Sequence, residues 1–224
     1  ASYRRQRQMC IRDRFGSTGL TGRQLIKILN EDPSFKDILL ISRVKIDNLD
    51  KKFKIVITHD FSIKNLSKLV KGCDVVFSLI GTTQKKVNWD KKKYRDIDFQ
   101  INYNIALASK KNLVRKLILV SSSGANLKSQ NFYLKLKAEI ESEISKLEIK
   151  NFITLRPSLL LGRRKEFRFF EKIAQLFMPM ISFILPNEYK PVSAFKVAKT
   201  MVYVSKLNQL GNIVISNKDI LQAN

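Results

Sequence analysis

Tyr133 and Lys137 are four positions apart in the segment Tyr133-Leu-Lys-Leu-Lys137, so on a helix they lie on the same face. A nearby ammonium favours the ionised form of a phenol, which suits the phenol to exchange a proton with a substrate oxygen. The run Ser121-Ser122-Ser123 ends an apolar segment just before the pair, and a serine hydroxyl there can hold the same oxygen. Tyr–Lys pairs at this spacing arise by chance in a lysine-rich chain, so their position after the serine run is the stronger signal. The pattern predicts proton transfer at a carbonyl or alcohol.

Three glycines punctuate the segment Gly16-Ser-Thr-Gly19-Leu-Thr-Gly22, which leads into a helix. Glycines at this spacing permit a tight turn, close approach of the backbone to a pyrophosphate, and close packing of the helix on a strand. The N–H groups at the helix N-terminus can then bind the anion. The pattern predicts a dinucleotide-binding loop, and a plain structural turn is the alternative.

Arg43 ends the apolar segment that follows the glycine loop. Sites that select NAD usually have an Asp or Glu at this point, which binds the ribose hydroxyls. A guanidinium there can instead pair with a 2′-phosphate through two hydrogen bonds. Arg43 therefore favours NADP(H) over NAD(H), unless it is one more surface cation in a chain rich in Lys and Arg.

Two later segments end in residues that suit the rest of a dinucleotide. Asp60 could accept a hydrogen bond from the adenine amino group, while Phe61 covers the adenine ring. Leu79 and Ile80 end another apolar segment, and Gly81 after them would let the backbone contact the sugar and phosphate of the cofactor.

Apolar segments of strand length alternate with helical patterns along the chain. The expected strands lie at 38–41, 53–57, 74–80, 116–120 and 152–155, and the expected helices at 23–30, 66–70, 97–111 and 132–147. Short, continuously apolar strands separated by helices indicate a parallel sheet covered on both faces. The fold class is therefore α/β, a Rossmann-type doubly wound sheet, followed by a small C-terminal substrate segment.

The first fourteen residues do not match this pattern. A glycine loop of this kind normally follows a buried apolar strand, but Arg12, Asp13 and Arg14 stand there. Burying such charges without partners would cost several kcal/mol each. The stretch Met9-Cys-Ile-Arg-Asp-Arg14 also resembles the translation of an adapter used in sequencing libraries. We predict that residues 1–14 are not native and replace the first strand, and that residues 15–224 form a single domain.

Composition narrows the function classes. The chain of 224 residues has 42 Lys+Arg against 19 Asp+Glu, a net charge of +23. The lysines are spread in short groups rather than gathered on one segment, so we attribute them to genome composition and expect no specific nucleic-acid binding. Two Cys and one His exclude a disulfide framework and make a zinc site implausible. The absence of a bilayer-length apolar run and of a signal peptide leads us to expect a cytoplasmic protein.

These motifs together resemble a known family. They occur in the order found in the atypical short-chain dehydrogenase/reductases, and the similarity runs from residue 15 to about 221. The closest resemblance is to the Tat-interactive-protein oxidoreductase group, including its bacterial members, within the wider NmrA- and epimerase-like proteins. The segments that carry it are the glycine loop, Arg43, Asp60-Phe61, Leu79-Ile-Gly-Thr-Thr83, Ser121-Ser-Ser-Gly-Ala125, Tyr133 with Lys137, and Leu155-Arg-Pro157.

The resemblance implies roles for individual residues. Tyr133 would be the proton donor, and Lys137 its partner that also binds the nicotinamide ribose. The hydroxyl that orients the substrate corresponds to Ser122 or Ser123, because three consecutive serines leave two registers open; we favour Ser122.

Further positions follow from the same resemblance. Pro157 and Leu160 would line the nicotinamide, and Arg168 would lie near the cofactor or substrate, with 158–195 forming a substrate or lid segment. The positions that match the phosphate loop are Gly16, Thr18, Gly19, Leu20, Thr21 and Gly22.

The function we expect is an NADP(H)-dependent oxidoreductase that acts on a small molecule. The segment 163–186 is rich in Phe and Met, which indicates an apolar substrate pocket, unless these residues pack in the core or contact a partner or a membrane surface. The main alternative is a cofactor-binding sensor or regulatory protein with little or no turnover. The hypothesis that the protein binds nucleic acid rests on its net charge alone. Oligomerisation is left open.

Overall fold

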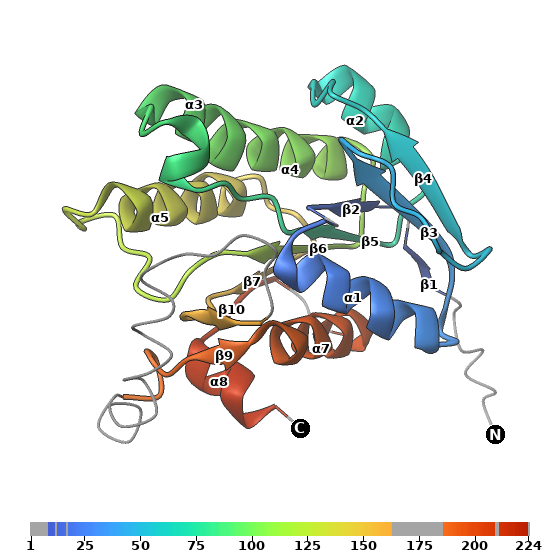
Figure 1. Ribbon diagram of the computed structural model, residues 1–224. Helices are drawn as coiled ribbons and strands as arrows, with labels where there is room; N and C mark the ends of the chain where they lie inside the picture. Colours follow the sequence, from blue (N-terminus) through green and yellow to red (C-terminus); the bar gives the residue numbers. More distant parts are fainter. Residues whose placement is uncertain (1–8, 12, 17, 163–185, 209–210, 224) are drawn as a thin grey trace.

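The structure, a computed structural model, is a parallel β-sheet between two layers of helices (Figure 1). It describes residues 9–11, 13–16, 18–162, 186–208 and 211–223. Within these residues the main sheet has eight strands, all paired in parallel. From one edge to the other they are β4 (Phe53–Ile57), β3 (Phe35–Ser42), the pair β1 (Met9–Ile11) and β2 (Asp13–Phe15), β5 (Val75–Ser78), β6 (Lys116–Val120), β7 (Asn151–Leu155) and β10 (Gly211–Ile215). The predicted doubly wound α/β fold is confirmed.

Residues 9–11 and 13–15 supply the first strand of this sheet as two short pieces. Both pieces pair with β3, and β2 also pairs with β5, so that Phe15 lies between Ile41 and Ser78 in register. The charged segment before the glycine loop therefore does take the central place in the sheet. Strand pairing uses the backbone N–H and C=O groups, which every residue except proline carries, whatever its side chain. This pairing does not test the origin of residues 1–14, which stays a prediction.

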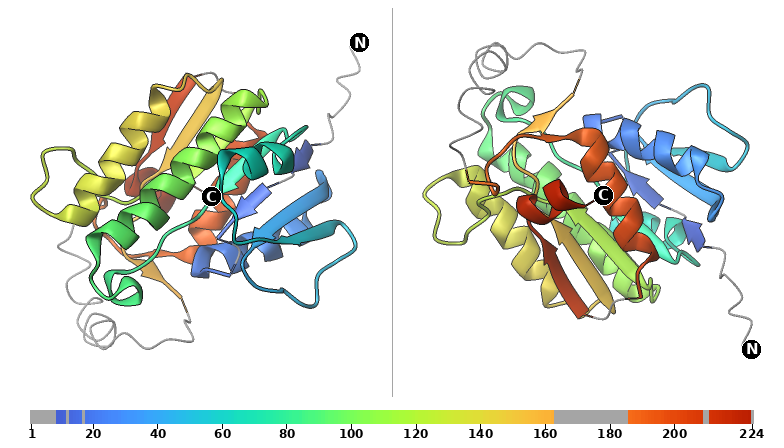
Figure 2. Two further views of the ribbon diagram at one scale, coloured as in Figure 1. Left: turned by 90° about the horizontal axis from the view of Figure 1, so that it is seen from above. Right: turned by 90° about the horizontal axis from the view of Figure 1, so that it is seen from below.

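Helices cover both faces of the sheet. One face is covered by α1 (Leu20–Glu31), α7 (Ala194–Lys206) and α8 (Asn217–Gln222), and the other by α2 (Ile63–Leu69), α4 (Ile101–Lys111) and α5 (Phe132–Ser145) (Figures 1 and 2). Successive side chains of a strand point to opposite faces, so each buried strand must be apolar on both sides. In β5, Val75 and Phe77 belong to the core under α1 and α7, whereas Val76 belongs to the core under α4 and α5.

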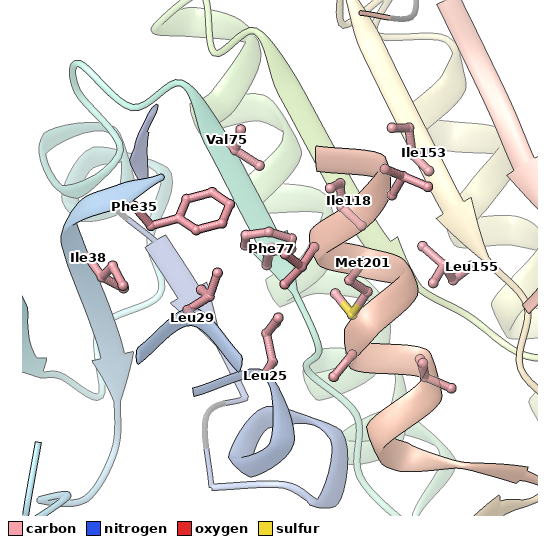
Figure 3. Close-up of a cluster of buried hydrophobic side chains, with 14 of the residues drawn as sticks. Leu25, Leu29, Phe35, Ile38, Val75, Phe77, Ile118, Ile153, Leu155 and Met201 are labelled. Atoms are coloured by element: carbon pink, nitrogen blue, oxygen red, sulfur yellow. The ribbon is translucent and has the colours of Figure 1, made fainter. Parts of the chain in front are cut away.

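The core on the α1 and α7 side is close-packed (Figure 3). Leu25 and Leu29 of α1 and Met201 of α7 reach toward Phe77 and Ile118 on the central strands, and none of these five side chains is exposed to solvent. Buried side chains of this size stabilise a fold by about 1.5–3 kcal/mol each. This packing fixes α1, and with it the glycine loop that precedes α1.

The elements that frame the site lie at the carboxyl ends of the strands. The loop after β5 contains a 3₁₀ turn, η1 (Gln84–Val87), and leads into α3 (Lys91–Arg95). The expected helix at 97–111 begins instead with a π-helical turn, η2 (Asp96–Gln100), which continues into α4. A small parallel sheet of β8 (Leu160–Leu161) and β9 (Val192–Ser193) follows β7. The strands and helices expected from the apolar patterns did not include η1, α3, β8, β9, β10, α7 or α8, and all of these except α7 are short segments without clear periodicity.

In the part of the chain that the structure describes, no helix has the length and apolarity that crossing a bilayer requires.

Gly16 is the point where the glycine loop touches β5. Its φ of +88° is a conformation that side chains disfavour, and a β-carbon there would lie 2.4 Å from the carbonyl oxygen of Leu79. Backbone atoms cannot move aside cheaply, so only glycine fits at this position.

We therefore expect Gly16→Ala to lower the free energy of unfolding by at least about 2–3 kcal/mol, through backbone strain and steric overlap together. Gly211→Ala is the matched control, because Gly211 also has a positive φ (+92°) but has open space around its Cα. It should cost only about 1 kcal/mol. Urea unfolding of both variants measures the difference, and equal effects would show that contact with Leu79 contributes nothing.

Candidate active site

A cavity of about 480 Å³ lies at the carboxyl edge of the sheet, where the glycine loop meets the ends of β3, β4 and β5. The predicted residues that line it are Gly16, Thr18, Gly19, Arg43, Phe61, Leu79, Ile80 and Gly81. The lining residues that sequence reasoning did not assign are Ile41, Ser42, Val44, His59, Thr82, Lys86, Ile97 and Ile101. Open α/β sheets bind ligands at this edge, where the strand order reverses.

The glycine loop presents a helix N-terminus to this cavity. The N–H of Gly19 donates to the carbonyl of Gly16 at 3.1 Å, and Gly19 is the N-cap of α1 without a side chain that could cap it. Uncapped N–H groups and the helix dipole make such an end suitable for a phosphate. Leu20, Thr21 and Gly22 form the buried first turn of α1, so they support the loop rather than line the cavity.

Arg43 and Lys86 bring two positive charges to the lining of the same cavity. Arg43 is exposed at the end of β3, where the Ser42 hydroxyl accepts a hydrogen bond from the N–H of Val44 at 3.2 Å and closes the turn. Lys86 comes from η1, a turn that its sequence did not reveal. Cationic side chains in the lining of a cavity suit a phosphate group.

Asp60 does not line the cavity, in contrast to the prediction that it contacts adenine. Its carboxylate accepts a hydrogen bond from the N–H of Ser62 at 2.9 Å, at the start of α2. This bond and one from the Ser62 hydroxyl lower the pKa of Asp60. The side chain is therefore used locally in the turn, and only Phe61 of this pair faces the cavity.

A second cavity, of about 590 Å³, adjoins the first, and Thr82 lines both. The predicted residues in its lining are Ser122, Ser123, Tyr133 and Leu160. The others are Thr82, Thr83, Gln84, Tyr94, Asn131, Ser158, Leu159 and Tyr189. Tertiary folding thus brings the ends of β5 and β6, the start of α5 and the β8 segment around one space.

Tyr133 is held at the start of α5. The side chain of Asn131 accepts hydrogen bonds from the N–H groups of Tyr133 (2.9 Å) and Leu134 (3.3 Å), which caps the helix. The ring of Tyr94 meets that of Tyr133 edge to face at 6.4 Å, and the Tyr94 hydroxyl donates to the carbonyl of Thr82 at 3.2 Å. These contacts keep the Tyr133 phenol at the cavity that it shares with the serines.

The two candidate serines differ in their hydrogen bonds. The Ser123 hydroxyl donates to the carbonyl of Glu188 at 2.7 Å, whereas the Ser122 hydroxyl makes only a longer contact, 3.2 Å, with the carbonyl of Ser123. Ser122 therefore has the more available hydroxyl. Pro157 is buried and does not line the cavity. Its carbonyl accepts a hydrogen bond from the N–H of Ser123 at 2.8 Å.

Lys137 forms a buried ion pair with Asp98, a residue that sequence reasoning missed. The Lys137 Nζ lies 2.9 Å from Asp98 Oδ1, and the side chains are 6% and 1% exposed. Burial by itself would lower the pKa of Lys137, but the nearby charges of Asp98 and Glu141 outweigh it, so the pKa is raised. The second carboxylate oxygen of Asp98 accepts a hydrogen bond from the N–H of Thr82 at 2.7 Å.

This ion pair lies next to Gly81, which lines the first cavity. A β-carbon on Gly81 would be 3.5 Å from Asp98 Oδ1 and 3.9 Å from Lys137 Nζ. Lys137 thus sits next to Gly81 but lines neither cavity, and its predicted contact with a ribose is not part of the described geometry. Arg168 lies outside the described residues, as does most of the 158–195 segment.

A family model described as NAD(P)H-binding matches residues 16–165 of the chain. Protein FMP52, mitochondrial, from Candida albicans is 36% identical, over 67% of each chain. The protein of the same name from Debaryomyces hansenii is 33% identical, over 85% of each chain. Both relatives are named mitochondrial, so the expectation of a cytoplasmic protein is wrong.

Solved structures show the same fold at low sequence identity. A UDP-N-acetylglucosamine 4-epimerase from Methanobrevibacter ruminantium M1 superposes with a TM-score of 0.70 at 18% identity, covering 93% of this chain and 76% of the epimerase. A uronate dehydrogenase from Agrobacterium tumefaciens gives a TM-score of 0.68 at 14% identity, covering 92% of this chain and 75% of the dehydrogenase. The resemblance to the short-chain dehydrogenase/reductases is confirmed, and the chain belongs to the NAD(P)H-binding family, with the fungal FMP52 proteins as relatives.

Proposed function

We propose that the protein is an NADP(H)-dependent oxidoreductase of the atypical short-chain dehydrogenase/reductase type. The observation that carries this proposal is the arrangement of two cavities that meet at Thr82. One is built like a dinucleotide site around the glycine loop, and the other is lined by a phenol and two serine hydroxyls. Membership of the NAD(P)H-binding family supports the cofactor class.

The residues of the first cavity fit a nicotinamide dinucleotide. Gly16 and Gly19 let the backbone approach the pyrophosphate, and the N-terminus of α1 would bind it. Gly81 would leave room for a ribose next to Lys137. Arg43 and Lys86 would pair with a 2′-phosphate, which NADP has and NAD lacks. The bound cofactor would supply or accept a hydride at a carbonyl or alcohol carbon.

The protein residues would handle the proton and the substrate oxygen. Tyr133 would donate a proton to the oxygen during reduction and take it back during oxidation. Ser122, with its weakly engaged hydroxyl, would hold the same oxygen in place. The ammonium of Lys137 lies 5.7 Å from the centroid of the Tyr133 ring, so the two residues of the predicted pair are neighbours. Asp98 holds this ammonium in place.

The substrate class that fits the second cavity is a small molecule with an apolar part. Leu159, Leu160 and Tyr189 supply apolar surface to its lining, to which Ser122, Ser123 and Tyr133 add hydroxyl groups. Apolar walls with a few placed polar groups are typical of small-molecule sites.

A cofactor-binding sensor with little turnover is the second candidate. The observation that favours it is that Lys137 is buried and bonded to Asp98 instead of facing the cavity. In that case the residues around Tyr133 would report cofactor binding without completing a reaction.

Two further proposals concern the chain itself. We propose that residues 1–14 are non-native and that 15–224 form the domain; the family match that starts at residue 16 supports this. Resequencing of the source gene tests this proposal. A gene that encodes residues 1–14 directly before residue 15 would contradict it. The names of the fungal relatives support a mitochondrial location.

Arg43→Gln should weaken NADPH binding by about 10- to 100-fold and leave NADH binding unchanged, because only NADPH loses a charged hydrogen bond to its phosphate. Fluorescence titration with both cofactors measures this. Lys45→Gln is the control, since Lys45 is an exposed cation two residues away that pairs with Asp47. Equal affinity of the unaltered protein for both cofactors would remove the proposed role of Arg43.

Tyr133→Phe distinguishes an enzyme from a sensor. We expect turnover with a panel of carbonyl compounds to fall by at least about 100-fold, because general acid catalysis contributes that much, while NADPH affinity stays within about twofold. Tyr203→Phe, a change of an exposed tyrosine on α7, controls for loss of a phenol. Turnover that persists in Tyr133→Phe would contradict the catalytic role.

Asp98→Asn should leave Lys137 buried without a counter-ion and lower the free energy of unfolding by about 3–5 kcal/mol. The pKa of Lys137 should fall, since Asp98 raises it, so the alkaline limb of the pH–rate profile should move to lower pH. Glu143→Gln is the matched control, because Glu143 pairs with Lys146 at 2.6 Å on the surface and should contribute less than about 1 kcal/mol. Urea unfolding and pH–rate profiles test the two effects. An unchanged pH–rate profile would argue against a role of Asp98 in positioning Lys137.

A further inference from the structure

Trp89 is the single tryptophan of the chain, and it points into solvent. It lies in the short connection between η1 and α3, and its side chain is 71% exposed. Tryptophan contributes more apolar surface than most side chains and is usually largely buried in a folded protein. Its exposure therefore needs an explanation that packing within the described residues does not provide.

The backbone holds Trp89 in this position against its own preference. Asn88 and Trp89 both have positive φ, +51° and +62°, and a bulky residue rarely adopts this conformation. The N–H of Trp89 donates to the carbonyl of Gln84 at 2.8 Å, which fixes the turn. Asp90 then begins α3 by accepting hydrogen bonds from the N–H groups of Lys92 and Lys93. Backbone strain that is kept in place by surrounding bonds is a reason to look for a function.

Lysines surround Trp89 on both sides in the sequence. All of them are exposed, and they are Lys85, Lys86, Lys91, Lys92 and Lys93. The only acidic residue among positions 84–95 is Asp90, whose carboxylate is engaged with the N-terminus of α3. The Lys91 ammonium lies 5.7 Å from the ring of Phe132, and Lys93 lies 3.8 Å from Asp90. The segment from η1 to α3, which lies at an outer corner of the molecule (Figure 1), therefore carries five exposed lysines and one large exposed aromatic side chain.

We propose that this surface, formed by Trp89 and the five lysines, binds the surface of an anionic lipid bilayer. Tryptophan favours the headgroup region of a membrane, where its ring is partly apolar and its N–H can still form hydrogen bonds. Lysines next to it are attracted by anionic headgroups. The combination suits a flat, negatively charged and partly apolar partner. Lys86 also lines the proposed cofactor cavity, whereas Trp89 and the other four lysines line neither of the two cavities.

The position of the surface gives this binding a consequence. Gln84, which accepts the hydrogen bond from Trp89, also lines the larger cavity. Contact with a bilayer at Trp89 would bring lipid close to the rim of that cavity. If the proposed function holds, the substrate could be an apolar molecule taken from the membrane surface.

This chain offers a direct probe, because all of its tryptophan emission comes from Trp89. The protein is titrated with vesicles of phosphatidylcholine and phosphatidylglycerol, and separately with vesicles of phosphatidylcholine alone. The expected result is a blue shift of the emission and co-sedimentation with the anionic vesicles only, both reduced by salt. Unchanged emission with anionic vesicles would overturn the proposal.

Variants separate this surface from the general positive charge of the chain. Lys92→Gln with Lys93→Gln should weaken co-sedimentation by about fivefold per lysine, as expected for charges near an anionic surface. Lys27→Gln with Lys199→Gln removes two exposed lysines from α1 and α7, on the opposite face of the sheet, and should change it by less than about twofold. Trp89→Ala should weaken it by at least about tenfold. Equal losses in the two lysine pairs, or none in Trp89→Ala, would show attraction by net charge alone and overturn the proposal.

Trp89→Gly tests whether the strained turn is kept for binding. Glycine adopts positive φ freely, so the melting temperature should rise by about 2 °C while vesicle binding falls as in Trp89→Ala. A lower melting temperature would show that Trp89 stabilises the fold and would contradict the proposal. A blue shift of the unaltered protein with duplex DNA that equals the shift with vesicles would assign the surface to nucleic acid instead.

Discussion

The carboxylate of Asp98 is the point on which the site depends. Its two oxygens accept hydrogen bonds from the Lys137 ammonium and from the N–H of Thr82, so a single side chain connects α5 with the loop that follows β5. A charge buried this deeply must be paired and hydrogen-bonded. The pairing therefore restricts where α5 can lie relative to the sheet. Tyr133 is carried on the same helix, one turn before Lys137, so its position in the lining of the second cavity follows from that restriction.

The π-helical turn is what places Asp98. A regular α-helix through residues 96–100 would rotate the side chains differently, whereas the wider turn brings Asp98 inward and leaves the helix free to continue as α4. Asn102 supports the turn, because its side-chain N–H groups donate to the carbonyls of Asp98 (2.6 Å) and Ile80 (3.3 Å). It also accepts a short hydrogen bond from the hydroxyl of Ser78. The helical run and the end of β5 are therefore joined twice.

The lysines that contribute to the net charge of +23 lie in very different environments. Lys137 is buried and paired with Asp98. Lys116 is buried at the start of β6, where its ammonium donates to the carbonyls of Val204, Ser205 and Leu207 at the end of α7, and burial lowers its pKa to about 8. The lysines around Trp89 are solvated. Lysine thus occurs in a buried ion pair, at the end of a helix and on the surface. Composition alone cannot distinguish these environments.

Local sequence determined the sheet, its helices and the residues at the strand ends. Apolar runs and glycine spacing depend only on neighbouring residues, which is why Gly16, Arg43, Gly81 and Tyr133 were found and do line the two cavities. The tertiary structure decided that Asp98 pairs with a lysine 39 positions away, that Thr82 lies between the cavities, and that Asp60 turns toward Ser62. It also decided that a charged segment completes the sheet beside β3. The physical reason is that these contacts join segments distant in sequence, and burial in the folded chain sets their strength, whereas periodicity and spacing report only what each segment prefers alone.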